Sequence, residues 1–258
     1  YIFLFAFIIF LIFIIVAIVL VAAGGTAYYM VKSQDKTSQE FFSKSDIKPT
    51  MDSIKSSIIN CQDVSAKDSL DKIGIQGGYS SKPEKNLDLG WAFIPYYYDE
   101  GAYLMPSPQK IEKELAAYTD DNIHYCIEEL SYDDFTLVYD ASKTTATIEE
   151  AKVIFDTDAT FTFKKSELST QFDLKNHPIE IESSLADILQ VASYITESHK
   201  EDPQMICISC VADMASEKNL YVDMLDFNQE TDSLIVISEN YTSSEPYVFE
   251  FLNKYPSA

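Results

Sequence analysis

Arginine is absent from this chain of 258 residues, in which every one of the 19 basic residues is a lysine. The 41 acidic residues outnumber them and bring the formal net charge to −22 at pH 7. Arginine supplies the bidentate contacts with which proteins hold phosphates and read guanine, and an acidic surface repels a phosphate backbone. The composition therefore indicates that the chain binds no nucleic acid.

Glycine is scarce as well: of seven in the chain, Gly74, Gly77 and Gly78 stand together within residues 73–79. A phosphate-binding loop needs the spacing GxxxxGK[ST] between a strand and a helix. This stretch lacks that spacing and follows a predicted helix. We interpret it as a sharp break at a helix end.

Charge is missing altogether from residues 1–23, which are almost entirely apolar. As a helix these residues would be roughly 35 Å long, enough to cross a hydrocarbon core of about 30 Å. The segment is apolar on every side, so we predict a helix over 1–25 that inserts into the membrane and then packs against copies of itself. The residues predicted to make these contacts follow one another along the segment: Phe3, Phe7, Phe10, Ile14, Ile18 and Val21.

The chain begins with Tyr1, directly at the apolar segment. A secretory leader is cut after its apolar stretch, whereas a pilin-type leader is cut before it, and the sequence favours the second pattern. In these features the chain resembles the type IV pilin class and its archaeal pilin-like relatives, although Phe5 stands where many bacterial pilins carry Glu. The resemblance implies an extracellular filament subunit that is inserted in the membrane before assembly.

Three parts are predicted along the chain. They are the apolar helix 1–25, a stem or helix extension 26–49, and an extracellular domain 50–258 with a helical part 50–130 and a sheet-rich part 131–258. Polar and charged residues prevail in the stem, and Gly24 and Gly25 mark the point where the apolar run stops.

Helices are predicted where apolar residues recur at helical spacing. Ile54, Ile58 and Cys61 fall on one face of the first helix, and Ser107 followed by Pro108 is a strong start for a second. Beyond residue 131 apolar and polar residues alternate, which is typical of antiparallel strands with one solvated face, and a further helix is predicted after residue 184. The predicted fold class is α+β: a long N-terminal hydrophobic helix, a helical pair, then a mostly antiparallel sheet with a packed helix.

A second resemblance covers more of the chain. The stretch Ile-Gly-Ile-Gln-Gly-Gly-Tyr at 73–79 stands between a helix bearing one cysteine and an aromatic stretch, and Glu-Pro-Tyr-Val-Phe follows at 245–249. In this layout the chain is similar to a family of extracytoplasmic proteins of small-genome archaea that carry a pilin-like leader and one apolar helix. The resemblance implies a location and an architecture, but no activity.

Four cysteines permit three disulfide connectivities, and outside the cell they should be oxidised. A bond between Cys61 and Cys126 would join the two predicted helices, while Cys207 and Cys210 are close enough to pair with each other. Two alternatives remain open for the second pair. One is a redox-active CxxC of the thioredoxin type, and the other is a zinc site. The further ligands of such a zinc site would be two of His124, His177, His199, Cys61 and Cys126.

Other candidate sites are weaker. The three histidines are scattered, so surface positions are expected for each, and acidic doublets such as Asp120-Asp121 are interpreted as solvated faces. Asn240 begins the single N-glycosylation sequon. We expect no cofactor, no metal and no enzymatic activity.

The predicted function is that of a structural subunit of an extracellular pilus-like filament. The subunit polymerises through its apolar helix, for adhesion or cell contact, and its partners are copies of itself and, before assembly, the membrane. One alternative is a single-pass anchored ectodomain that binds a cell-surface partner. The other is a thiol-disulfide enzyme that uses Cys207 and Cys210.

Overall fold

The computed structural model describes residues 51–130, 132, 136–165, 168–201, 206–227, 232–239 and 246–254. From Ser53 onward they belong to one compact unit, Ser53–Ala258. The described helices are α2 (Met51–Ile75), α3 (Pro108–Glu128), α4 (Leu185–Glu201), α5 (Ile208–Glu217) and the short 3-10 helix η1 (Leu174–Asn176). The described strands are β1 (Asn86–Asp88), β2 (Phe93–Asp99), β3 (Ala102–Tyr103), β4 (Thr136–Tyr139), β5 (Lys143–Ile148), β6 (Lys152–Asp158), β7 (Thr160–Lys165), β8 (Leu168–Asp173), β9 (Ile179–Glu182), β10 (Leu220–Phe227), β11 (Asp232–Glu239) and β12 (Val248–Lys254).

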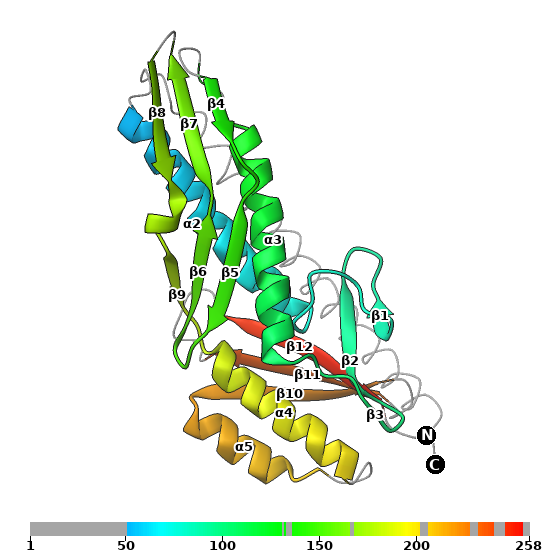
Figure 1. Cartoon of the computed structure of the whole chain (residues 1–258). Helices are drawn as coiled ribbons and strands as arrows, with labels where there is room; N and C mark the ends of the chain where they lie inside the picture. The colour runs from blue at the N-terminus through cyan, green and yellow to red at the C-terminus, as the bar shows by residue number, and fades with distance from the viewer. Residues whose placement is uncertain are drawn as a thin grey trace, which may run out of the picture. The chain divides into compact units, whose positions relative to one another are not determined.

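The largest sheet has the strand order β1-β2-β12-β11-β10, with β3 paired to β2 (Figure 1). Strands β10, β11 and β12 are antiparallel neighbours, and Ile237 of β11 lies between Val222 of β10 and Phe249 of β12. Strand β12 also pairs with β2, in parallel, with Leu252 opposite Tyr96. The strand nearest the end of the described chain therefore lies at the centre of the sheet.

Two smaller antiparallel sheets, β4-β7-β8 and β5-β6-β9, lie end to end beside α3 (Figure 1). A single residue, Ala159, separates β6 from β7, and η1 lies between β8 and β9. Alternate side chains of β6 and β7 are buried, as the period of two in the sequence predicts: Val153, Phe155, Phe161 and Phe163.

Helices α4 and α5 pack on the same side of strands β10–β12 (Figure 1). The helix predicted after residue 184 is confirmed as α4, and its Leu185, Ile188 and Ile195 are all buried in the core. Helix α5 adds Val211 and Ala215 to the same core. Together these side chains cover the face of the sheet from which Ile, Val and Phe residues project.

The glycine-rich stretch ends helix α2, as predicted. The N–H of Gly78 donates to the carbonyl of Ile73 at 2.8 Å, and the N–H of Gly77 donates to that of Gly74 at 3.0 Å, which together form a Schellman motif. Gly77 has a φ of 52°, and a Cβ on it would lie 2.5 Å from the carbonyl oxygen of Glu250. The chain can therefore turn there and still pack against β12.

The predicted fold class is wrong as stated. It places a long apolar helix at the head of the chain, but no long apolar helix is found within residues 51–254 as far as they are described, and segment 1–25 lies outside them. It also orders a helical pair before the sheet, whereas β1–β3 lie between α2 and α3, and α4 and α5 lie between β9 and β10. The chain is α+β with mostly antiparallel sheets. Its helices after α2 stand between groups of strands, and the largest sheet combines β1–β3 from the first half of the chain with β10–β12 from its end.

None of the helices within the described residues is both long and apolar enough to cross a bilayer. The predicted stem 26–49 lies outside the described residues. The start of α3 is confirmed: Ser107 is its N-cap, and its side chain accepts a hydrogen bond from the N–H of Lys110.

Candidate functional site

Both expected disulfides are present. Cys61 of α2 and Cys126 of α3 are bonded with a Cα–Cα distance of 5.7 Å, and Cys61 is 1% exposed. The bond joins the two long helices across 65 residues of sequence, and Cys126 at its other end is half-buried. Its position is that of a structural crosslink.

The second disulfide, Cys207–Cys210, lies at the N-terminus of α5 and is exposed. Cys207 is the N-cap residue of this helix, and its Sγ accepts a hydrogen bond of 3.2 Å from the backbone N–H of Cys210. The Ser209 hydroxyl lies 3.5 Å from the same sulfur. The positive end of a helix dipole thus faces the sulfur of Cys207.

A groove of about 480 Å³ lies between α5 and β10 and reaches the residue that follows Cys207. Ile208, which stands between the two cysteines in sequence, lines the groove and is 69% exposed. Most of the remaining lining is apolar, with three residues that carry polar groups among it: Val211, Ala212, Ala215, Leu220, Val222 and Met224, together with Ser216, Asn219 and Tyr221. Strand β10 is an edge strand among the described strands.

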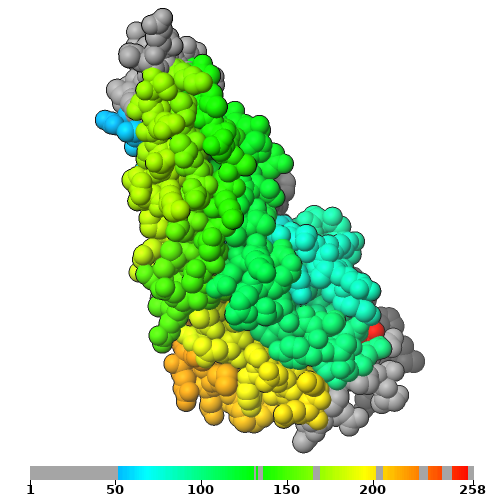
Figure 2. Space-filling model, in the orientation of Figure 1, coloured from blue at the N-terminus to red at the C-terminus, as the bar shows by residue number. Residues whose placement is uncertain are grey.

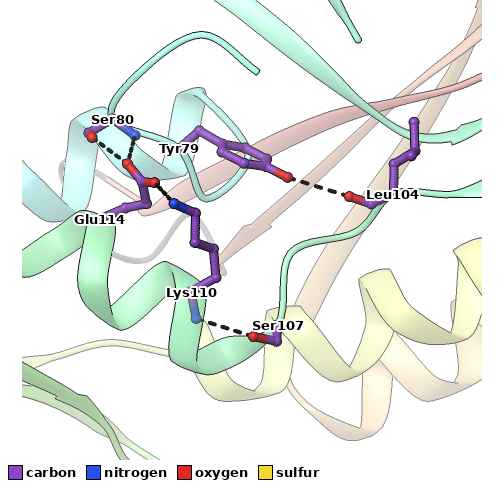
Figure 3. Close-up of polar contacts among 6 residues, drawn as sticks. All are labelled: Tyr79, Ser80, Leu104, Ser107, Lys110 and Glu114. Atoms are coloured by element: carbon purple, nitrogen blue, oxygen red, sulfur yellow. Dashed lines mark hydrogen bonds and ion pairs between the residues drawn. The ribbon is translucent and has the colours of Figure 1, made fainter. Parts of the chain in front are cut away.

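The turn after the glycines is held to α3 by a buried carboxylate (Figure 3). Glu114, 7% exposed, accepts hydrogen bonds from the N–H of Ser80 at 3.0 Å and from the Ser80 hydroxyl, and pairs with Lys110 at 2.5 Å. Burial opposes ionisation of Glu114, but the hydrogen bonds from Lys110 and Ser80 outweigh it and lower the pKa of the carboxyl. These contacts compensate the negative charge of Glu114. The residue is therefore explained by a structural role, which is to hold the turn to α3.

Tyr79, from the same turn, donates a hydrogen bond of 3.4 Å to the carbonyl of Leu104 (Figure 3). The turn is therefore fixed both to α3 and to the segment that leads into it. A Cβ on Gly78 would lie 2.9 Å from the side chain of Ile111, so α3 itself fills the space beside this glycine. The glycines serve close packing, in agreement with their interpretation as a helix end.

The histidines do not converge. His124 lies 2.8 Å from the hydroxyl of Tyr139 on the surface, and His177 is exposed beside Phe172. Among the described residues no group of three or more His, Cys, Asp or Glu side chains is placed to hold a metal ion. The alternative of a zinc site at Cys207 and Cys210 is thus unsupported, and both sulfurs are joined to each other.

His199 is 1% exposed, and the expectation of a surface position for it is wrong. Its Nδ1 lies 2.6 Å from Nδ2 of Asn253 on β12. Burial lowers the pKa of His199 to about 4, against an opposing effect of Asp226. The imidazole is therefore neutral at pH 7. The spacing of four residues from Ile195 on the buried stripe of α4 is the signal that could have identified it.

Trp91 is 72% exposed at the turn between β1 and β2, although its neighbours Phe93 and Ile94 are buried. Farther along the same aromatic stretch Tyr97 and Tyr98 are buried, whereas Tyr103 on β3 is 38% exposed. The tryptophan is exposed because it belongs to the turn and not to the strand.

Two sets of predicted site residues cannot be placed. The assembly residues Phe3, Phe7, Phe10, Ile14, Ile18 and Val21 and the sequon residue Asn240 lie outside the described residues. Sequence reasoning missed helix α5 and with it the groove. The signal was present, since Val211 and Ala215 are four residues apart and follow a cysteine, a residue type that can serve as an N-cap.

The strongest candidate site is thus the exposed disulfide together with the groove beside it. No family model, no curated protein and no solved structure matches the chain.

Proposed function

We propose that the chain is a structural protein of the cell surface, a disulfide-linked α+β domain that the apolar segment 1–23 assembles into a filament. One observation carries the proposal: both pairs of cysteines are joined, which fits a compartment in which thiols oxidise. The sequence adds a segment of 23 residues without charge, and no polar stripe that would suit the surface of a membrane. The filament and the membrane are then two environments of one apolar segment.

The domain suits display outside the cell in a second way. The chain's net charge of −22 lies outside the uncharged segment; it favours solubility and discourages contact between domains, so contacts between subunits fall to that segment. The bond between α2 and α3 resists unfolding of the domain when it is exposed to solvent and proteases.

Substitution Ile14→Lys tests the filament. In a bundle of apolar segments the lysine would be buried without a carboxylate to pair with, at a cost of several kcal/mol for each subunit. In a bilayer the same side chain can reach the interface, at a cost of about 3 kcal/mol. We expect the variant to remain in the membrane fraction and to yield no filaments by electron microscopy of material sheared from cells.

Ile14→Leu is the matched control, because it keeps the segment apolar and should leave filaments intact. Filaments of normal length from the lysine variant would refute assembly through this segment. Intact chain that stays with the membrane in the unsubstituted protein, with none in the sheared fraction, would favour a single-pass anchored ectodomain instead.

A further inference from the structure

We propose that the Cys207–Cys210 disulfide is a thiol-disulfide exchange site whose substrate is an extended polypeptide segment with two cysteines. The inference goes beyond the filament function, since it uses α5 and β10 and no residue of segment 1–23. It rests on three observations: the place of the sulfurs in the helix, their exposure, and the groove next to them.

The position of Cys207 at the N-terminus of α5 favours the thiolate form of its sulfur. The N–H of Cys210 already donates to this Sγ in the oxidised protein, and α5 is a helix of ten residues. When the disulfide is reduced, that N–H and the positive end of the helix stabilise the thiolate of Cys207. A stabilised thiolate is the nucleophile of thiol-disulfide exchange and also its better leaving group.

An attacking thiolate can reach this bond. Both cysteines are exposed, and Figure 2 shows α5 (orange) at the surface beside α4 (yellow). In the other disulfide, Cys61 is buried and Cys126 is half-buried. Exposure at a helix N-terminus distinguishes a disulfide that reacts from one that serves stability.

The groove would select the substrate, because a peptide bound in it places its thiols near the disulfide. It holds apolar side chains from α5 on one side and from β10 on the other, and β10 lies at the edge of its sheet among the described strands. An extended peptide can pair with such an edge and place alternate apolar side chains in the groove. Helix α5 also carries two exposed acidic residues, Asp213 and Glu217, so a peptide that also carries lysine is favoured.

The reaction is a balanced exchange. A substrate thiolate attacks Sγ of Cys207, a mixed disulfide forms, and the Cys207–Cys210 bond breaks with its electron pair on Sγ of Cys210. The second substrate thiolate then attacks the substrate sulfur of the mixed disulfide and releases Cys207. The substrate leaves with a new disulfide, the protein holds two thiols, and a small-molecule disulfide re-oxidises it in two further exchanges.

The test uses the full chain in detergent micelles and two variants with one thiol each. Cys210→Ala keeps the thiolate at the N-cap, whereas Cys207→Ala keeps a thiol one turn inside the helix. Each is mixed with a peptide that has one internal disulfide flanked by leucine and lysine. We expect Cys210→Ala to form a mixed disulfide about tenfold faster than Cys207→Ala, and its thiol pKa to lie below the ordinary cysteine value.

Equal rates for the two variants, or no adduct from Cys210→Ala, would overturn the exchange site. Peptide mapping that finds Cys61 and Cys126 still joined, with an unchanged unfolding temperature, shows that a slow variant is folded. The two proposals stay separate, because loss of filaments in the Ile14→Lys variant leaves this exchange rate untouched.

The groove has its own test in the oxidised chain. Ile208→Ser removes an exposed apolar side chain of the groove, and Val138→Ser, on β4, removes one elsewhere as a control. We expect Ile208→Ser to slow oxidation of a reduced peptide dithiol about fivefold, and to leave reaction with dithiothreitol unchanged. An unchanged peptide rate, or an equal loss with both thiols, would remove the groove from the proposal.

Discussion

The two disulfides of this chain differ in the two properties that decide what a disulfide contributes. Cys61–Cys126 spans 65 residues and lies against the interior, whereas Cys207–Cys210 spans three and lies at the surface. A long closed loop restricts the unfolded chain strongly, and a short one restricts it little. The comparison teaches that one kind of bond can serve two ends. In the α2–α3 region it stabilises the fold, and in the α5–β10 region it stays accessible to other thiols.

The largest expected effect comes from removal of the buried bond. The double variant Cys61→Ser, Cys126→Ser should lose about 4 kcal/mol of unfolding free energy, because a loop of 65 residues is no longer closed in the unfolded state. Urea unfolding of the double variant and of the unsubstituted chain measures the difference. A loss below that of the surface pair would reverse the comparison.

The α4–α5 region is stabilised by packing, and the buried His199 in α4 makes the stability of the protein depend on pH. The pKa of His199 in the folded protein is about 4, below the ordinary value of 6.5, so the unfolded chain takes up the proton first. Stability is fully present above pH 6.5, falls as the pH drops toward 4, and loses roughly 3 kcal/mol in total from this group.

Urea unfolding at pH 7 and pH 4 measures this loss, and His199→Gln is the control because its side chain does not titrate. The expected observation is a smaller decrease for the variant than for the unsubstituted chain. Identical decreases would show that carboxyl groups such as Glu114, whose lowered pKa also costs stability in acid, account for all of it.

A third prediction concerns the glycine turn at the end of α2, which leads from this disulfide-bonded helix toward strand β1. Gly77→Ala places a Cβ 2.5 Å from a β12 carbonyl in left-handed backbone, and should cost roughly 2 kcal/mol more than Gly90→Ala. Gly90 also has a positive φ, but no atom lies within 4 Å of its would-be Cβ. Thermal unfolding of both variants decides it, and equal losses would mean that backbone strain alone matters at this turn.

The smallest effect is expected for the surface disulfide. The double variant Cys207→Ser, Cys210→Ser opens a loop of three residues and should lose about 1.5 kcal/mol on the chain-entropy estimate. A serine hydroxyl can still cap α5, which limits the loss further. A loss near that of the buried pair would show that this bond is structural, and would weaken the exchange proposal.

The sequence predicted what depends on neighbours along the chain. The i, i+4, i+7 spacing of Ile54, Ile58 and Cys61 placed the cysteine on the buried face of α2, and Ser107 with Pro108 located the start of α3. Period-two alternation located β6 and β7, since one face of each strand is buried. These signals are local, so a sequence alone contains them.

What the sequence could not supply depends on distant pairing. Strand β2 pairs with β12 across about 150 residues, and nothing in either segment specifies the other, so the predicted order of helices before sheet was wrong. The candidate site was half predicted. The CxxC was visible as a motif, but the groove needs β10 to lie beside α5, and that is decided by the sheet.

The central place of β12 has a consequence for how the protein forms. Synthesis proceeds from the N-terminus, so Cys61 and Cys126 are available for bonding long before residues 248–254 are made. The β1–β2 hairpin and the β10–β11 pair, however, have no common strand until β12 arrives between them. Contacts of such high sequence separation slow folding and leave strand edges open meanwhile. The chain therefore completes its largest sheet late, and a truncation before residue 248 would leave two sheet fragments joined by covalent and helical contacts alone.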